Sequence, residues 1–365
     1  MPSLLPNCWR FAAQKFRCSI VLGAVLVIPT NASTQTFEVL GSRALGMAGA
    51  FVAVADDATA TYWNPAGLAS GPVLDLVLER QQGDALMDGR NRPLDTGTRG
   101  MRGSSLAFAL GTPPLGLSYY RIRTTSLPWP VAGASADRQN VRSREAGVRT
   151  LLTQHFGATL VQSLTPRVTL GTTLKIVRGT AAEGSVTAAT AEGALTAGTD
   201  LDGISRTTFD LDAGLLATYG PWRAGIVGRN LKQPKFAVSA AGPVAQVKLA
   251  RQLRAGFAFA PRSRPTGANG PLTVAADVDL ERVETVLGRR RELAIGGERW
   301  WAGGRIGGRA GVRLNTLTRD DQHHDPVIAV GFSVSPRSGS LIEGQVTRGQ
   351  NSLEQGWGIT ARVTF

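Results

Sequence analysis

The three histidines are the side chains best suited to acid–base chemistry. His155 stands in a segment with strand-like alternation, whereas His323 and His324 stand in the acidic run from Asp320 to Asp325. A hydrolase would need a serine–histidine pair oriented by a third group, and no serine motif singles out a partner for His155. Carboxylates beside imidazoles can bind a divalent ion, but this spacing fits no closed site. We therefore predict no enzyme, no catalytic residue, no metal site and no cofactor, and interpret the acidic run as a solvated external loop.

A glycine-rich run at residues 303–308 has the composition of a phosphate-binding loop. Phosphate loops act through the N-terminus of the helix that follows them. Here the run stands within strand-like sequence and no helical pattern follows it. We interpret these glycines as positions that face a crowded interior or a bend.

Charged side chains at alternating strand positions form the second group of candidates. They are Lys175, Asp210, Asp212, Asp277, Asp279, Arg309 and Arg313. A charge that faces lipid near the membrane midplane costs about 2–4 kcal/mol, so we expect these side chains to line a polar lumen. Two interpretations stay open, namely ion pairs that brace a plug and a selective path for a solute, and we favour bracing.

The elements that would position these charges are strands, because the dominant period from residue 72 onward is two. In the last segment, Trp357, Ile359 and Phe365 alternate with Thr360 and Arg362. Repeated ten-residue segments of this kind are typical of transmembrane β-barrels, in which one face meets lipid and the other a wet interior. The candidate strands are residues 72–81, 104–111, 115–123, 150–164, 166–178, 206–219, 222–231, 247–260, 271–282, 289–300, 303–316, 326–335, 339–348 and 355–365. The predicted fold is all-β, a transmembrane antiparallel up-and-down barrel of about 14 strands over residues 72–365.

The connections between these strands alternate in length. Short turns are expected at 111–116, 164–167, 219–222, 300–303 and 335–339, and longer polar loops at 82–103, 124–149, 179–205, 232–246, 283–288, 317–325 and 349–354. Outer-membrane barrels have short periplasmic turns and long external loops, so both termini are predicted to be periplasmic. Tyr219, Trp222, Trp300, Trp301 and Trp357 lie near strand ends, which is typical of interfacial aromatic residues.

Residues 1–32 have the organisation of a secretory signal peptide. Three basic residues precede an apolar run at 19–28, and cleavage is expected near Ala32. Cys8 and Cys18 both lie in this segment, so the exported chain would carry no cysteine. The formal charge of +13 would fall to 13 − 3 = +10 after cleavage. The arginines are scattered and lack interleaved aromatic residues, which argues against a nucleic-acid partner. We expect them to contact phosphate-bearing outer-membrane lipid and lipopolysaccharide.

Residues 33–71 are rich in glycine and alanine, as a segment packed inside a narrow lumen requires. Asn64 can cap a helical turn that starts at Pro65 and ends at Gly67. Asp56 and Asp57 could cap a second short turn. We therefore predict that this segment plugs the barrel.

The run GSRALGMAGAFVAVADDATATYWNPAGLA at residues 41–69 resembles the N-terminal signature of the FadL superfamily of outer-membrane barrels. The resemblance is closest to the PorV/PorQ-like and TraF-like branch. The matching positions include Gly41, Arg43, Gly46, Met47, Gly49, Asp56, Asp57, Asn64, Pro65, Ala66 and Gly67. The resemblance implies a fourteen-stranded barrel in the bacterial outer membrane with an N-terminal hatch, and covers about a tenth of the chain.

Two functions fit this resemblance. The first is passive uptake of a hydrophobic or amphipathic small molecule through the plugged lumen. Fatty-acid transporters of the superfamily present apolar external loops, whereas the long loops here are polar apart from a patch at residues 126–131. The second function is that of a PorV-like or TraF-like accessory barrel, which docks a protein partner of a secretion or surface-assembly system. A purely structural barrel is the third option.

Overall fold

A computed structural model describes residues 36, 38–86, 94, 98–128, 144–238, 246–261, 269–317, 326–349 and 354–365. The predicted signal peptide, the acidic run with His323 and His324, and residues 129–131 of the apolar patch lie outside these ranges. Among the described residues, no helix combines the length and the apolar character needed to cross a membrane.

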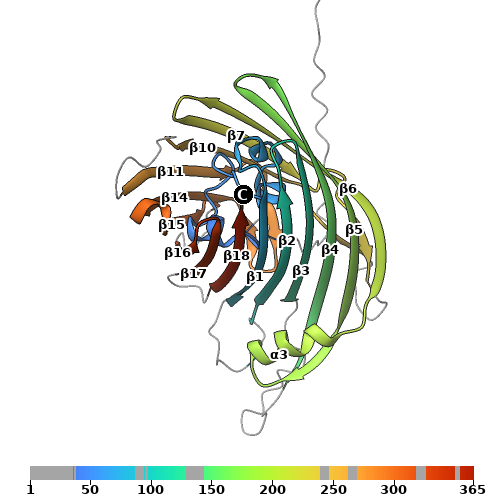
Figure 1. Ribbon diagram of the computed structural model, residues 1–365. Helices are drawn as coiled ribbons and strands as arrows, with labels where there is room; N and C mark the ends of the chain where they lie inside the picture. Colours follow the sequence, from blue (N-terminus) through green and yellow to red (C-terminus); the bar gives the residue numbers. More distant parts are fainter. Residues whose placement is uncertain are drawn as a thin grey trace, which may run out of the picture. The chain divides into compact units, whose positions relative to one another are not determined.

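Fourteen strands form a closed barrel in which all neighbours are antiparallel (Figure 1). The chain visits them in order around the wall, and β1 closes the barrel by pairing with β18. Their bounds are β1 Asp75–Leu86, β2 Gly100–Gly111, β3 Leu115–Leu127, β4 Arg144–Thr165, β5 Val168–Ala188, β6 Ile204–Tyr219, β7 Trp222–Arg229, β10 Gln252–Phe259, β11 Asn269–Asp279, β14 Glu292–Trp301, β15 Ile306–Asn315, β16 Val327–Arg337, β17 Ser340–Gly349 and β18 Gln355–Thr364. Each predicted strand corresponds to one of them, and the predicted fold class is confirmed.

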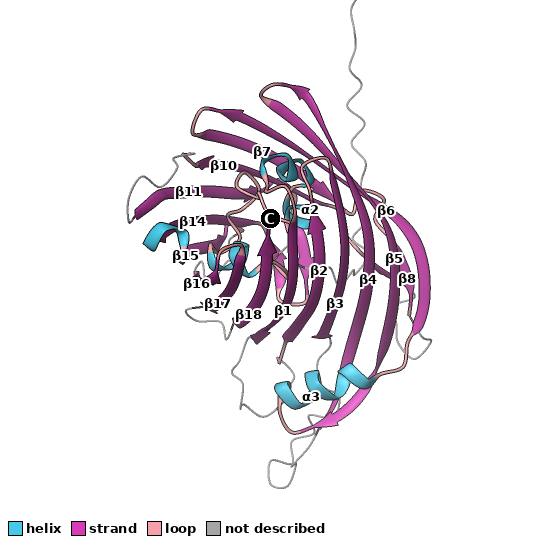
Figure 2. Ribbon diagram, viewed as in Figure 1, coloured by secondary structure: helices cyan, strands magenta, loops and turns pink. Residues whose placement is uncertain are grey.

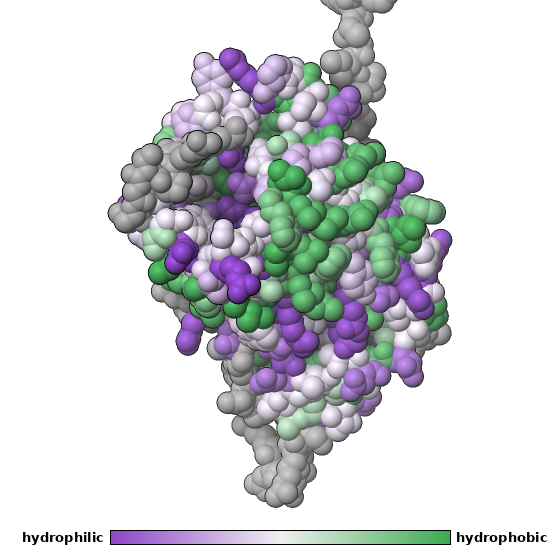
Figure 3. All heavy atoms as spheres, viewed as in Figure 1, coloured by the Kyte–Doolittle hydropathy of each residue, from purple (hydrophilic) through white to green (hydrophobic). Residues whose placement is uncertain are grey.

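The two-residue period separates an apolar outer face from a polar inner face. In β1, for example, Leu78 is 52% exposed, whereas Glu79 beside it is 2% exposed. A band of hydrophobic side chains crosses the outer surface and is bordered by hydrophilic residues (Figure 3). This is the arrangement expected of a wall with lipid outside and a filled lumen inside.

Strands β4 and β5 are longer than predicted, at 22 and 21 residues. Residues 144–149 and 179–188, which we predicted as loops, continue the β4–β5 ladder as far as the pair Arg144 and Ala188. This part of the prediction was wrong because its Gly-, Ala- and Thr-rich composition carries a weak strand signal. Helix α3 (Ala191–Ala197) and the 3₁₀ turn η2 (Gly198–Asp200) follow near the ends of these strands (Figure 2).

Two hairpins stand outside the barrel ladder. The first joins β8 (Lys235–Ala237) to β9 (Gln246–Lys248) and packs Phe236 against Val177 and Ala181 of β5. The predicted strand at 247–260 is therefore divided between β9 and β10. The second hairpin joins β12 (Val283–Thr285) to β13 (Gly288–Arg290). We predicted a loop at 283–288 and the next wall strand from 289, but residues 289–290 belong to this hairpin. A third short element, η3 (Ala302–Gly304), makes the turn between β14 and β15.

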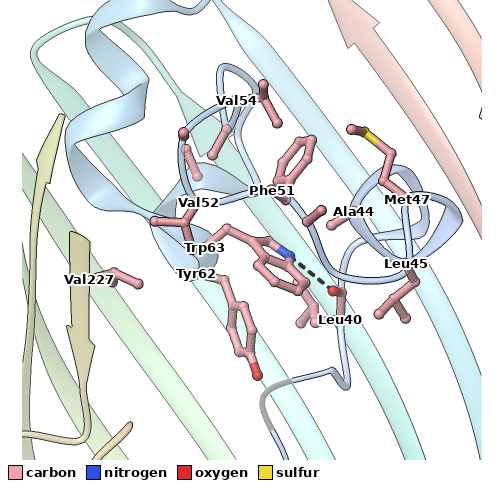
Figure 4. Close-up of a cluster of buried hydrophobic side chains, with 14 of the residues drawn as sticks. Leu40, Ala44, Leu45, Met47, Phe51, Val52, Val54, Tyr62, Trp63 and Val227 are labelled. Atoms are coloured by element: carbon pink, nitrogen blue, oxygen red, sulfur yellow. Dashed lines mark hydrogen bonds between the residues drawn. The ribbon is translucent and has the colours of Figure 1, made fainter. Parts of the chain in front are cut away.

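Residues 38–71, which we call the plug after their predicted role, share one hydrophobic core with inward-facing wall residues such as Tyr120 and Val227. The helical elements of the plug are α1 (Ser42–Gly46), α2 (Ala60–Trp63) and η1 (Pro65–Ser70). Phe51, Tyr62 and Trp63 pack together, and the Trp63 indole donates a hydrogen bond to the carbonyl of Leu40 at 3.0 Å (Figure 4). These side chains are at most 1% exposed, so the apolar contacts fix the plug as one unit.

Candidate functional site: the plug and the lumen wall

The Asn-Pro-Ala-Gly turn anchors the end of the plug. Asn64 caps η1 by accepting a hydrogen bond from the amide of Ala66 at 3.2 Å, and Pro65 opens this helix. The Asn64 amide group also donates to the carbonyls of Val52 at 2.9 Å and of Leu215 on β6 at 3.1 Å. Gly67 does not end the helix, contrary to our expectation. It lies inside η1, where an added methyl group would collide with the backbone of the plug.

Arg43 is the centre of a buried charge cluster. Its guanidinium donates to both carboxylate oxygens of Glu298 on β14, at 2.7 and 2.8 Å, and to Asp56 and Asp57 at 2.6 and 3.1 Å. Arg309 on β15 contacts the same Glu298 carboxylate at 2.6 Å. The cluster therefore ties α1 to a second part of the plug and to the wall through bidentate, charge-assisted bonds.

Of the two aspartates that we predicted as caps, only Asp57 accepts from a nearby backbone amide, that of Thr59 at 2.9 Å. Asp57 also lies 3.7 Å from Arg362 on β18. Burial alone would raise the pKa of Asp57, but Arg362 and Arg43 outweigh it and hold the pKa below its ordinary value. The Asp57 carboxylate is thus kept charged between two arginines.

The first turn of the plug is held by Glu79 of β1. Its two carboxylate oxygens accept from the amides of Gly41 and Ser42, each at 2.6 Å. The hydroxyl of Thr360 on β18 donates to Glu79 at 2.8 Å and lies 2.7 Å from the Ser42 hydroxyl. A wall carboxylate therefore satisfies amides at the start of α1 that have no partner within the helix.

A second wall carboxylate holds the middle of the plug. Asp277 of β11 accepts from the amides of Phe51 and Val52, each at 2.8 Å. Arg254 of β10 bridges Glu38 at the beginning of the plug to Asp279 of β11. Together these contacts connect the plug to wall strands on the side opposite Glu79.

Glu38 lies among charged groups of the wall and lines the polar cavities beside it. Burial alone would raise its pKa, but the charges of Arg254 and Arg313 outweigh this effect and lower the pKa below the ordinary value of 4.5. The contact between Glu38 and Arg254 therefore persists at neutral pH.

Glycines of the wall make room for the plug backbone. Gly46 of α1 and Gly331 of β16 face each other so closely that a methyl group on Gly46 would lie 3.1 Å from the Gly331 Cα. Methyl groups on Gly296 or Gly311 would collide with the carbonyl of Met47, and one on Gly171 with the backbone of η1. The small residues of the sequence signature thus meet small residues of the wall.

Lys175 belongs to a different cluster. It lies 2.9 Å from Asp210 and 2.7 Å from Asp212, both on β6. These carboxylates also accept from the amides of Lys232 at 3.1 Å and Asn230 at 2.8 Å, just after β7. This cluster joins wall to wall, whereas Arg43, Asp277 and Arg254 join wall to plug.

The remaining predicted lumen charge, Arg313 of β15, pairs with Glu354 just before β18. Gly49 is also one of the signature positions, and its carbonyl faces the Arg254 guanidinium at 3.5 Å.

Glu79 and Glu298 are the important contacts that the sequence interpretation missed. Each lies an even number of residues from a small or buried residue of its own strand, as Glu79 does from Val77 and Glu298 from Ala294. Residues at such a spacing share one face of the strand, so this spacing was the available signal for an inward carboxylate. Trp300 was interpreted as an interfacial residue, but it shares the inward phase with Glu298.

Two cavities approach α1 from opposite sides. One, of about 90 Å³, lies toward the end of the barrel with the long connections and is lined by Leu45, Gln81, Ser105, Gln345 and other residues. The other, of about 630 Å³, opens toward the end with the short turns and is lined by Arg43, Asp56, Trp300, Arg362 and others. The five residues of α1 stand between them.

Comparisons with known proteins place the fold. The family described as the F plasmid transfer operon TraF protein matches residues 115–279, from β3 to β11. No curated protein matches the sequence. Among solved structures, a FadL homologue from Pseudomonas aeruginosa is similar with 11% identity and a TM-score of 0.55, covering 92% of this chain and 100% of the other.

Two transporters are also similar in structure. The toluene transporter TbuX from Ralstonia pickettii has 14% identity and a TM-score of 0.58, with 90% of this chain and 99% of the other covered. The toluene transporter TodX from P. putida has 12% identity and a TM-score of 0.56, with the same coverage of both chains. The chain therefore has the fold of the FadL-like outer-membrane β-barrels.

Proposed function

We propose that this protein is an outer-membrane barrel for the passive uptake of a small hydrophobic or amphipathic molecule, and that the solute passes when the plug moves away from the wall beside α1. The fold supports an outer-membrane channel, since its structural neighbours include toluene transporters. An export signal at residues 1–32 and a bacterial outer-membrane location belong to the same proposal.

The observation that carries this proposal is the pair of cavities on either side of α1. Leu45 lines the first cavity and Arg43, two residues away, lines the second. A displacement of one short helix would join them. That helix is held by polar contacts to Glu79, Thr360 and Glu298 rather than by the barrel ladder, so it can move without breaking strand pairs.

The lining favours an amphipathic solute over a wholly apolar one. Around the first cavity, polar side chains such as Gln81, Ser105, Thr124 and Gln345 outnumber apolar ones such as Leu45. Gln81 donates to Glu79 at 2.8 Å and Ser105 to the carbonyl of Val39 at 2.6 Å, and the remaining hydrogen-bonding capacity of these groups is open to a polar atom of a solute. A solute with both an apolar and a polar part can use that capacity and still cover Leu45, which a wholly apolar solute cannot do.

A reversible disulfide between α1 and the wall tests the proposal. The hydroxyl oxygens of Ser42 and Thr360 lie 2.7 Å apart, so side chains at these two positions reach each other, as a disulfide requires. In a chain with Cys8 and Cys18 replaced by serine, S42C/T360C should lock α1 against β18 when oxidised. We expect uptake of an amphipathic dye into proteoliposomes to stop on oxidation and to return on reduction.

The control is a disulfide of matched geometry that leaves the plug free. The hydroxyl oxygens of Thr159 on β4 and Thr173 on β5 are also 2.7 Å apart, and T159C/T173C links wall to wall only. Uptake should not depend on the redox state of this variant. If locked and reduced S42C/T360C transport the dye equally, solutes do not pass beside α1 and the proposal fails.

A second candidate function is docking of a protein partner, as an accessory barrel would do. It is favoured by the TraF family match over residues 115–279. The matched region contains the long β4–β5 extension and α3, which lie at the end with the long connections. Deletion of α3 with unchanged dye uptake and lost function in cells would favour docking over uptake.

A further inference from the structure

A row of arginines follows the edge of the apolar band on the outer surface of β1 to β5. Arg80 is opposite Leu106, Leu106 is opposite Arg121, Arg121 is opposite Gln154, and Gln154 is opposite Arg178. The three arginines therefore lie in one cross-strand row, on every second strand. All three side chains are exposed, and they lie on the outer face of the barrel, the face that also carries the apolar band.

The row next to the arginines, toward the short turns, is apolar and largely aromatic. It consists of Leu78, Phe108, Tyr119, Phe156, Ile176 and Phe209 in consecutive register. The rings of Tyr119 and Phe156 lie 4.8 Å apart, and the Phe156 side chain is 53% exposed. Aromatic rows of this kind mark the boundary between acyl chains and headgroups. The arginines thus stand at the level of the headgroups.

These arginines lack counter-ions in the part of the chain that the structure describes. No side-chain hydrogen bond or ion pair to a described residue involves Arg80, Arg121, Arg178 or the neighbouring Arg123. Neither their row nor the next one outward contains a carboxylate on the outer face. The first acidic residue beyond, Asp84, is already paired with Arg102 at 2.8 Å. Among the described residues, the row is therefore a strip of positive charge without counter-ions.

We propose that Arg80, Arg121 and Arg178 bind the phosphates of a diphosphorylated lipid in the membrane leaflet at this end of the barrel. Arginine pairs with phosphate oxygens through two parallel hydrogen bonds. Strands are about 4.8 Å apart, so successive arginines of the row are about 10 Å apart and the row spans about 20 Å. That span exceeds one phosphate and suits a headgroup that carries two. The acyl chains of the same lipid would cover the aromatic row.

This inference rests on the outer-membrane placement in the proposed function, but not on uptake. Nucleic acid is a poorer occupant because the adjacent exposed row is apolar. A soluble anion would not contact the aromatic row either. An arginine row on β1 to β5 lies next to an apolar row on β1 to β6, and this combination of phosphate-binding and acyl-binding groups is what selects a lipid.

The test measures binding of purified full-length protein to three lipids in detergent micelles by native mass spectrometry. The lipids are diphosphorylated lipid A, monophosphorylated lipid A and phosphatidylcholine. The variant is R80Q/R121Q/R178Q, and the single variant R121Q repeats the test should the triple variant not fold. The control, R167Q/R299Q/R337Q, removes three exposed arginines at the opposite end of the barrel.

We expect the natural chain and the control to prefer the diphosphorylated lipid at least tenfold, and the triple variant to lose that preference, with R121Q losing part of it. Equal losses in variant and control would show a bulk charge effect and overturn the proposal. Equal binding of the diphosphorylated and monophosphorylated lipids, or displacement by millimolar inorganic phosphate or a short DNA duplex, would also overturn it. Dye uptake by the same proteins reconstituted into proteoliposomes separates the two proposals, because a barrel that binds the lipid without transporting dye refutes only uptake.

Discussion

Replacing Arg43 by glutamine should loosen the plug without weakening the barrel. Arg43 makes two hydrogen bonds to Glu298 and one each to Asp56 and Asp57. Glutamine keeps most of the side-chain volume but removes the charge that these carboxylates share. None of the fourteen strand pairs of the wall depends on this residue.

The size of the effect follows from the partners that remain. Removing one member of a buried ion pair costs about 3–5 kcal/mol. Glu298 would keep Arg309 at 2.6 Å, and Asp57 would keep Arg362 at 3.7 Å, so we use the lower end of that range. About 3 kcal/mol corresponds to about a hundredfold change in an equilibrium constant. The population with a displaced plug should therefore rise by about two orders of magnitude.

Single-channel recording in planar bilayers measures this population as open probability. We expect Arg43→Gln to open about a hundredfold more often than the natural chain, with an unchanged temperature of barrel unfolding on heat-modifiable gels. Lys175→Gln is the matched control, because Lys175 pairs with Asp210 and Asp212 within the wall. It should lower the unfolding temperature without opening the channel. An Arg43→Gln channel that stays closed, or a Lys175→Gln channel that opens as often, would refute this account of the cluster.

Three other perturbations follow from the contacts of the plug and of α3. Gly171→Ala should displace η1 and expose the plug to limited proteolysis, because its methyl group would meet the Pro65 backbone. Gly103→Ala, whose methyl group would have only one neighbour at 4.0 Å, should leave the plug protected from the protease. Equal proteolysis of both variants would contradict the close packing of η1 against Gly171. The lowered pKa of Glu38 means that its contribution to docking is complete above about 4.5, the ordinary value, and is lost as pH falls through the lower folded-state pKa. Glu38→Gln should therefore raise the open probability above that of the natural chain between pH 7 and 5, and the difference should shrink below pH 4.5. No difference between the two chains at pH 7 would show that Glu38 does not hold the plug. Leu195→Ala should weaken the packing of α3 by about 2–5 kcal/mol, seen as faster cleavage at residues 189–203 with unchanged conductance, and a change in conductance would place α3 in the path.

The sequence was sufficient for the barrel because each strand carries its own local pattern. In β18, Trp357 and Ile359 are exposed while Thr360 and Arg362 are buried, as their alternation predicted. A period of two needs no knowledge of neighbouring strands. The β4–β5 extension could not be predicted in this way. Its residues pair with a partner strand but show little contrast between apolar and polar positions.

The sequence also singled out the residues of the plug signature, but not their partners. That Arg43 and Asp56 carry opposite charge is local information. That Glu298 lies beside Arg43, although the two are 255 positions apart in the sequence, is decided only when the barrel closes. The same holds for Ser42 beside Thr360 and for Gly171 beneath Pro65.

By itself, then, the sequence determined the strands, their inward and outward faces and a segment of small residues suited to a narrow lumen. These are properties of neighbouring residues along the chain. The tertiary structure decided which inward carboxylate meets which plug amide, which wall glycine receives which plug backbone, and where α1 stands between two cavities. Those contacts join the plug to wall strands that are distant in the sequence, and their geometry depends on strand register and closure, which a one-dimensional pattern does not contain.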